Sequence, residues 1–403
     1  MNATCNKKRL TVAIALALFA GNAAATSVED KIELLQQEIE ALKDQVAATK
    51  PNNISSGIQG LADRTTIGGY GNLNYNNFSG GATAKDQIDL QRFVLFFGHK
   101  FNDMVSFKSE FEIEHAISSA DDSGEVEVEQ AYLDFHFNDK VNAKVGLFLI
   151  PAGFLNETHE PTTFFGVERN QIESRIIPTT WREAGVAVYG EALPSLKYQV
   201  GITTGFSAKK FDDPLFGIKS AHQEGQLAES EDLALSASLN YTGINGLLVG
   251  GSVFTGNTGQ NEPGIANARL TLWDVHTRYQ TGNWDLRALY ARGHLNDAAD
   301  ITAFTGVSAP SAFYGWFTEA GYHVWKSGDM DFAPFIRYES YDTQASLPFN
   351  SSRVDGSKNK VWTVGANFWP HPQVVLKADF QSYDRKDEDR GDKRFNLGMG
   401  YMF

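Results

Sequence analysis

The chain has very little cysteine and no long apolar run, and each shortage excludes a class of protein. Its 403 residues contain one cysteine, Cys5, which precedes the first apolar stretch. Disulfides, zinc–thiolate sites and cysteine nucleophiles are therefore excluded for the rest of the chain. Beyond residue 20 no stretch approaches 18 consecutive apolar residues, so membrane-spanning helices are not expected.

Basic residues are also scarce. The chain has 35 Lys and Arg against 49 Asp and Glu, which gives a net charge of −14. Nucleic-acid binding needs an electropositive surface, so this balance argues against nucleic acid as a partner.

Residues 1–25 have the layout of a secretory signal peptide. Lys7, Lys8 and Arg9 precede an apolar run at residues 10–20, and small residues follow at 23–25. The run is too short to span about 30 Å of hydrocarbon, and Cys5 lies on the wrong side of it for lipid attachment. We therefore expect export and cleavage, which takes the net charge to −17.

Aromatic residues and glycine are plentiful in what remains. The chain has 28 Phe, 14 Tyr, 7 Trp and 37 Gly, yet its mean hydropathy is −0.30. A membrane protein can be hydrophilic on average when half of each spanning segment faces water, as in a β-barrel.

Residues 26–50 are predicted to form a short periplasmic coiled-coil helix. Apolar residues follow four-three spacing at Val28, Ile32, Leu35, Ile39, Leu42 and Val46. A helix about 30 Å long is marginal alone in water, so it needs a packing partner. Two arrangements remain open, a self-associating stalk and a helix packed on its own barrel. Residues 51–63 are expected to be a flexible linker.

From residue 64 to residue 403, segments of about ten residues alternate polar and apolar side chains. Seven tight turns and eight longer polar loops separate them and alternate strictly. This pattern predicts an all-β fold, a 16-stranded antiparallel transmembrane β-barrel with both ends on the short-turn side. Sixteen strands are expected to enclose a water channel rather than a packed core.

The two faces of each segment indicate which side meets lipid. Glu110 and Glu112 share one face, whereas Phe111 and Ile113 share the other, and residues 395–403 alternate in the same way up to an aromatic terminus. Charges at the bilayer midplane cost about 2–4 kcal/mol on the lipid side, so the charged faces are expected to point inward.

The longest connection in the first half of the chain, residues 151–181, is predicted to be a constriction loop folded into the lumen. It carries Glu157, His159, Arg169 and Arg175 among other charges. Rings of such side chains set the sign of the preferred solute. The alternative is a surface loop whose charges are merely solvated.

Several segments in order resemble the family of phosphate-selective porins O and P. They are residues 91–101 (QRFVLFFGHKF), 107–111 (FKSEF), 131–135 (AYLDF), 145–154 (VGLFLIPAGF), 168–169 (ER) and 182–186 (REAGV). The likeness is best over residues 64–205. It implies a homotrimeric porin in the outer membrane of a Gram-negative cell, surrounded by outer-membrane lipid and lipopolysaccharide, and it implies no cofactor.

The resemblance also implies a preference for anions. Arg92 matches a basic pore position of the family, but the next inward position is Val94, and Leu149 stands where the family has a lysine before the loop proline. An anion-attracting track, pore-lining or solute-binding, is expected from these basic residues: Arg92, Lys108, Lys144, Arg169, Arg175, Arg182, Arg337 and Lys377. An opposing acidic wall leaves open a weakly selective or cation-preferring diffusion porin.

Other classes of function have little support. A barrel hydrolase would need a Ser and His pair at the lipid edge, but His136 and His276 fall on predicted inward faces. No His, Asp or Glu group has metal-ligand spacing, and the glycines form no phosphate loop. No catalytic residue and no metal site are therefore expected. An envelope tether rests on the coiled coil alone.

Overall fold

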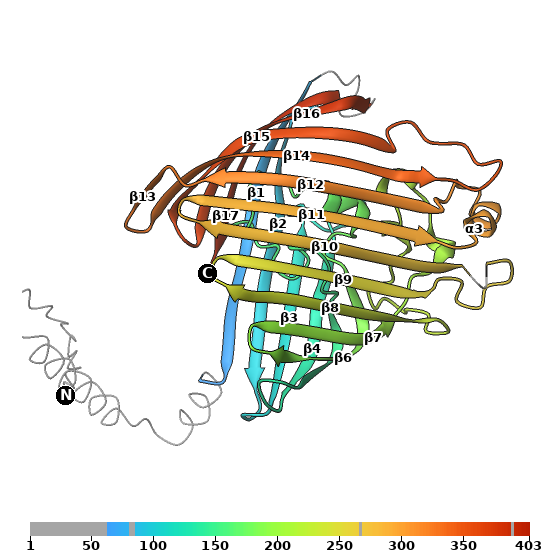
Figure 1. Cartoon of the computed structure of the whole chain (residues 1–403), viewed down its shortest axis with the longest axis horizontal. Helices are drawn as coiled ribbons and strands as arrows, with labels where there is room; N and C mark the ends of the chain where they lie inside the picture. The colour runs from blue at the N-terminus through green and yellow to red at the C-terminus, as the bar shows by residue number, and fades with distance from the viewer. Residues whose placement is uncertain (1–62, 80–84, 266–267, 388–390) are drawn as a thin grey trace, which may run out of the picture. The chain divides into compact units, whose positions relative to one another are not determined.

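The computed structural model describes residues 63–79, 85–265, 268–387 and 391–403 (Figure 1). The predicted signal peptide, coiled coil and all but the last residue of the linker lie outside the described residues. Within the described part of the chain, no helix is long and apolar enough to cross a membrane.

Strands make up most of the described chain. They are β1 (Thr65–Ser79), β2 (Gln87–Lys100), β3 (Val105–Glu114), β4 (Val126–His136), β5 (Asn142–Leu149), β6 (Arg182–Leu193), β7 (Leu196–Thr204), β8 (Leu233–Ile244), β9 (Leu247–Asn257), β10 (Arg269–Thr281), β11 (Trp284–Leu295), β12 (Ala312–Tyr322), β13 (Trp325–Ser327), β14 (Met330–Ser346), β15 (Lys358–His371), β16 (Val374–Asp387) and β17 (Gly391–Met402). The helices are short: η1 (Ile172–Ile176), η2 (Ala208–Lys210), η3 (Pro214–Phe216), η4 (Lys219–Ala221) and α3 (Ala298–Thr305).

Every strand pairs antiparallel with its neighbours, and β1 pairs with both β2 and β17, so the sheet closes on itself. β12 and β13 both pair with β14 and are separated only by His323 and Val324. They therefore count as one interrupted strand of the wall. The wall therefore has sixteen positions, and the predicted 16-stranded antiparallel barrel is confirmed.

The two ends of the barrel differ in the length of their connections. Two-residue turns join β10 to β11 and β13 to β14, and Gly282 and Gly328 provide the positive φ angles of 57° and 59° that such turns require. Long connections follow β5, β7 and β11 at the other end. Figure 1 shows α3, in one of these long loops, at the opposite end from β13.

The predicted faces of the last strand are confirmed. Phe395, Leu397 and Met399 are 42–43% exposed on the outer face, whereas Asn396 between them is fully buried. An apolar outer face and a polar inner face suit a wall between lipid and water.

A β-bulge interrupts the alternation in β4. Glu110 pairs with Gln130 and Phe111 pairs with Val128, so Glu129 is an extra residue. Gln130 donates a hydrogen bond to the inward-facing Glu110, and Glu129 is completely buried next to the loop that follows β5. The bulge thus turns two consecutive polar side chains into the lumen.

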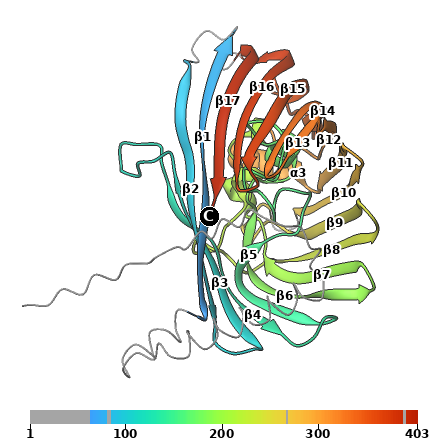
Figure 2. The same cartoon turned by 90° about the vertical axis from the view of Figure 1, so that its left-hand side faces the viewer.

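Part of the lumen is packed with apolar side chains. Trp181, Phe206 and Phe254 have ring centroids 4.5–5.6 Å apart, and residues of the long connections after β5, β7 and β11 join inward-facing residues of β10 to β12 around them. Figure 2 looks into the ring of strands, where loop segments coloured green lie inside it. The expectation of a water channel without a packed core is therefore wrong for this part of the interior, because the loops bring their own apolar residues.

Candidate functional site

The segment between β5 and β6 is fastened to the wall by its backbone. Val167 N donates to Asp379 Oδ2 at 2.6 Å, Gln171 N donates to Glu339 Oε1 at 2.5 Å, and Gly166 N donates to Asn367 Oδ1 at 3.3 Å. All three acceptors project inward from β14, β15 and β16. These bonds hold the segment against one side of the barrel interior.

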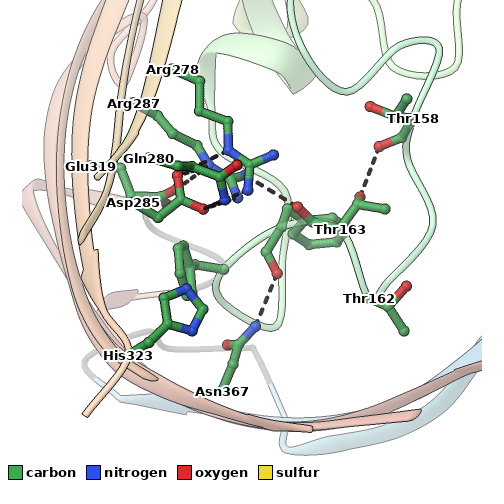
Figure 3. A network of polar contacts seen from close by, with 12 residues as sticks. Thr158, Thr162, Thr163, Arg278, Gln280, Asp285, Arg287, Glu319, His323 and Asn367 are labelled. Carbon is green, nitrogen blue, oxygen red and sulfur yellow. Dashed lines mark hydrogen bonds and ion pairs between the residues drawn. The ribbon is translucent and has the colours of Figure 1, made fainter. Parts of the chain in front are cut away.

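Side chains of β11 and β15 also donate to the segment's carbonyl groups. Arg287 Nη1 donates to Thr163 O at 3.2 Å, and Asn367 Nδ2 donates to Phe164 O at 3.0 Å (Figure 3). Asp285 accepts from both Arg287 and Arg278, which fixes the guanidinium group that reaches the segment. Buried backbone groups need such partners, so these bonds fix the path of the segment.

Glu173 shapes the segment from within. Its Oε1 accepts hydrogen bonds from Phe154 N at 2.6 Å and Leu155 N at 2.7 Å, and its Oε2 accepts from Asn170 Nδ2 at 2.6 Å. Burial raises the pKa of Glu173 although these hydrogen bonds oppose the shift. The carboxyl group ties the beginning of the segment to η1.

Two open cavities lie along the wall formed by β1 to β4. The outer cavity, of about 350 Å³, lies toward the long loops and includes Asn76, Gln87 and His115 in its lining. The inner cavity, also of about 350 Å³, lies toward the short turns and includes Thr66 and Gly98. His159 lines both, so the two cavities meet at this side chain. Together they form the candidate solute pathway.

The outer cavity carries more positive than negative groups. Its lining has five cationic side chains against three carboxylates; the cations are Arg92, Arg169, Arg175, Lys219 and Arg394, and the carboxylates are Asp89, Glu114 and Glu168. Burial and the charge of Arg92 lower the pKa of Arg169 to about 10, which still leaves Arg169 charged at neutral pH.

Carboxamide groups on β1 and β2 also line the outer cavity. Asn72 Nδ2 and Asn74 Nδ2 both donate to Gln91 Oε1, at 2.7 and 2.9 Å, and Asn76 Nδ2 donates to Asn396 Oδ1 at 2.8 Å. A row of amides offers donors and acceptors to a hydrated solute without adding charge.

The structure brings three of the eight predicted basic residues together in the outer cavity. Arg92 lies 3.5 Å from Glu112, Arg169 donates to Thr180 at 2.8 Å, and Arg175 donates to Gln171 and to the Leu215 carbonyl. Lys108 lines the inner cavity, where its Nζ lies 2.7 Å from Asp134 Oδ2.

The other four predicted residues line neither cavity. Lys144 is buried 3.8 Å from Glu157, and Arg182 pairs with Glu127 at 2.5 Å and Glu224 at 3.1 Å. Arg337 is held at 3.1 Å by each of Glu319 and Glu339, and Lys377 lies over the Phe164 ring at 3.6 Å. Arg337 and Lys377 contact the segment that follows β5 rather than open space.

Two basic residues of the outer cavity were not predicted. Arg394 shares the inward face of the last strand with Asn396, so the alternation of that strand could have identified it. Lys219 begins η4 in the long connection after β7, where no periodicity indicates which way a side chain points.

A closed 16-stranded barrel with an apolar outer face and a polar path through its lumen defines a transmembrane β-barrel channel. The chain belongs to the family of phosphate-selective porins O and P, whose family model matches residues 66–403. It is an outer-membrane channel protein.

Similar proteins are found by sequence and by fold. An uncharacterized protein of Aquifex aeolicus (strain VF5) is 34% identical over 370 residues, which cover 89% of this chain and 82% of that protein. OmpF of Salmonella typhi in complex with daunomycin has a TM-score of 0.58 at 10% identity, covering 84% of this chain and 97% of the other. The anion-selective porin of Comamonas acidovorans has a TM-score of 0.56 at 11% identity, covering 84% and 99%. At these identities the solved structures show a common fold.

Proposed function

We propose that the protein is a porin for the passive diffusion of small hydrophilic solutes, with a preference for anions such as phosphate or organic acids. The single observation that carries the preference is the excess of cationic side chains in the outer cavity. Guanidinium groups bind phosphate and carboxylate oxygens through paired hydrogen bonds, and a narrow space strengthens their attraction for anions.

We also propose that residues 151–181 form the constriction. The hydrogen bonds to β14, β15 and β16 support this, because they hold the segment inside the barrel, and so does His159 between the two cavities. The solute would then pass between the segment and the wall formed by β1 to β4.

A weakly selective or cation-preferring channel is the second candidate. Glu110, Glu112, Glu127 and Glu129 all project inward near the meeting point of the cavities, and they favour cations there. The sign of the selectivity depends on which of the two charge clusters limits the flow.

Reversal-potential measurements with the purified protein in a planar bilayer under a potassium chloride gradient test both candidates. An anion-preferring sign supports the first proposal, whereas a cation-preferring sign eliminates it in favour of the second. A complete absence of conductance steps from a correctly folded protein would overturn the open-pore assignment.

We propose a homotrimer, as the family resemblance implies, with the predicted coiled coil at residues 26–50 as its stalk. Chemical cross-linking of the full chain in detergent should give three-chain products. Deletion of residues 28–48 should reduce their yield if the helix is a stalk. An unchanged trimer yield, together with a weakened attachment of the outer membrane to the cell wall, would favour the tether instead.

A further inference from the structure

Three ligand-type side chains from separate parts of the chain meet where the two cavities join. Glu110 comes from β3, Glu129 from the bulge in β4, and His159 from the segment after β5; their oxygen and nitrogen atoms lie within 4.8 Å of one another. His159 Nε2 is 3.5 Å from Glu110 Oε1 and 3.5 Å from Glu129 Oε2. His159 is 4% exposed and Glu129 is fully buried.

The atoms that face one another have no hydrogen-bond partner among the described residues. Both carboxylate oxygens of Glu129 and Nε2 of His159 are in this state. Glu110 and Glu127 differ, because Glu110 Oε2 accepts from Gln130 at 2.6 Å and Glu127 accepts from Arg182 at 2.5 Å. An unpaired buried carboxylate is costly, so the space between these atoms calls for a positively charged occupant.

The other nitrogen of His159 indicates how the ring is arranged. Nδ1 lies 3.1 Å from the Asn156 carbonyl oxygen, which can only accept, so Nδ1 carries a proton. In the neutral ring, Nε2 then presents a lone pair to two carboxylates. A histidine whose outer nitrogen donates to a carbonyl while the inner nitrogen is free is the usual arrangement of a metal ligand.

The distances between His159 and the two glutamates distinguish a metal site from a simple ion pair. A charge-assisted hydrogen bond between imidazolium and carboxylate measures about 2.7–2.9 Å, which is shorter than the two 3.5 Å separations. Ligand atoms placed tetrahedrally at about 2.0–2.1 Å from zinc are about 3.3 Å apart. We propose that Glu110, Glu129 and His159 bind a divalent first-row transition-metal ion of the zinc type at the meeting point of the cavities.

The net negative charge around the site favours a bound cation. Four glutamates, Glu110, Glu112, Glu127 and Glu129, outnumber the arginines Arg92, Arg169 and Arg182 that act on the same cluster. A proton is the competing occupant. Burial alone would lower the pKa of His159, but Glu129 and Glu110 raise it to about 9. Metal binding would displace that proton.

A metal ion bound at this position would affect conduction through the channel. His159 lines both cavities, so an ion bound there lies beside the proposed solute path and adds positive charge to its wall. This consequence rests on the proposed channel function, whereas metal binding itself does not.

Metal binding can be measured on the intact protein. The full chain, purified without a histidine tag and stripped with a chelator, is dialysed against zinc chloride, and the metal is counted by elemental analysis. We expect about one zinc per chain. Glu129→Gln and His159→Gln should each lower the affinity at least tenfold. Glu157→Gln is the matched control, because this loop glutamate pairs with Lys144 and lies outside the ligand set.

Cobalt chloride gives a spectroscopic test of the same ligands. Tetrahedral cobalt should produce visible absorption in the wild-type protein and in Glu157→Gln, but not in His159→Gln. The proposal is overturned if wild-type protein binds no zinc, or if both ligand variants bind as much as wild type while retaining the heat-dependent gel mobility of a folded barrel. Conductance steps recorded without metal would uphold the channel in either case.

Discussion

Gly69 and Phe403 exchange two backbone hydrogen bonds: Gly69 N donates to Phe403 O at 3.0 Å, and Phe403 N donates to Gly69 O at 2.9 Å. They extend the ladder between β1 and β17 by one residue pair beyond Tyr70 and Met402. A Cβ atom on Gly69 would stand 2.3 Å from the Val94 carbonyl oxygen and 3.0 Å from the Phe403 ring. Glycine is therefore required where the last side chain crosses the first strand.

Deletion of Phe403 should weaken the closure of the barrel. Two backbone hydrogen bonds are lost, and each contributes about 0.5–1.5 kcal/mol. We expect a lower temperature for the loss of the folded form on unheated gels. Phe403→Tyr keeps the backbone and the ring and is the control; equal stability of the deletion and the control would show that the seam does not depend on this pair.

Arg175→Gln should shift selectivity toward cations. Removing one charge at an average separation of about 10 Å from a passing anion, in a water-like dielectric, changes the anion energy by about 0.4 kcal/mol, or about twofold in relative permeability. Reversal potential under a salt gradient measures this. Arg353→Gln is the control, since Arg353 pairs with Asp342 and lines neither cavity. The same shift in both variants would mean that overall charge, and not the outer cavity, sets selectivity.

Arg337→Lys should lower stability and leave the reversal potential unchanged. Arg337 holds the Phe165 carbonyl and pairs with Glu319 and Glu339, and a lysine cannot reproduce this forked geometry. Thermal unfolding and reversal potential are measured on the same preparation. A shift in reversal potential as large as that of Arg175→Gln would place Arg337 on the solute path.

Glu173→Ala should loosen the segment between β5 and β6, whereas Glu173→Gln should not. Alanine leaves buried donors of Phe154, Leu155 and Asn170 unpaired, at about 1–3 kcal/mol each, but glutamine keeps a carbonyl acceptor. We expect larger conductance and more current noise in the alanine variant alone.

The raised pKa of Glu173 adds a pH dependence with a definite sign. Its folded-state pKa lies above the unfolded value, so its contribution to stability increases as the pH falls and is lost as the pH rises through the folded pKa. Acidification should therefore not increase current noise through this residue. Noise that rises on acidification in wild type but not in Glu173→Gln would contradict this.

Trp181→Ala should weaken the apolar packing that anchors the segment between β5 and β6. Trp181 is fully buried between Phe206 and Phe254, and truncation of such an aromatic residue costs about 3–5 kcal/mol. Differential scanning calorimetry should show a lower transition temperature. Phe349→Ala, at a side chain that is 94% exposed, is the control and should unfold like wild type.

The wall of the barrel follows from the sequence because its signal is repeated. Period-two alternation places Phe395 outward and Asn396 inward, and the same pattern recurs in the other strands. Missing a single strand would have given an odd strand number, so the even number is a check on the assignment. The bulge at Glu129 was not predicted, although the sequence carries a signal for it. Polar residues occupy odd positions up to Glu129 and even positions from Gln130 onward. The ladder shows that this change is a bulge with two neighbouring residues facing inward.

The candidate site was less accessible to sequence reasoning. Glu110 and His159 are 49 positions apart, and no spacing rule links a strand glutamate to a loop histidine. Likewise, Phe206 belongs to a loop and Leu270 to an inward strand face, so their contact depends on how two long connections fold back. Such contacts arise from tertiary packing of irregular chain, for which local pattern gives no direction.

The segment after β5 is held by two unlike kinds of contact. Around Trp181 it is anchored by dry apolar packing, whereas at His159 and Glu157 it meets the wall through charges. Dissolved salt screens exposed charges, but it acts much less on buried ones, and the side chains of Lys144, His159 and Glu110 are all at most 9% exposed. Salt does not weaken apolar contact either. Both margins of the segment should therefore hold in concentrated salt, and conductance should rise in proportion to the conductivity of the bathing solution.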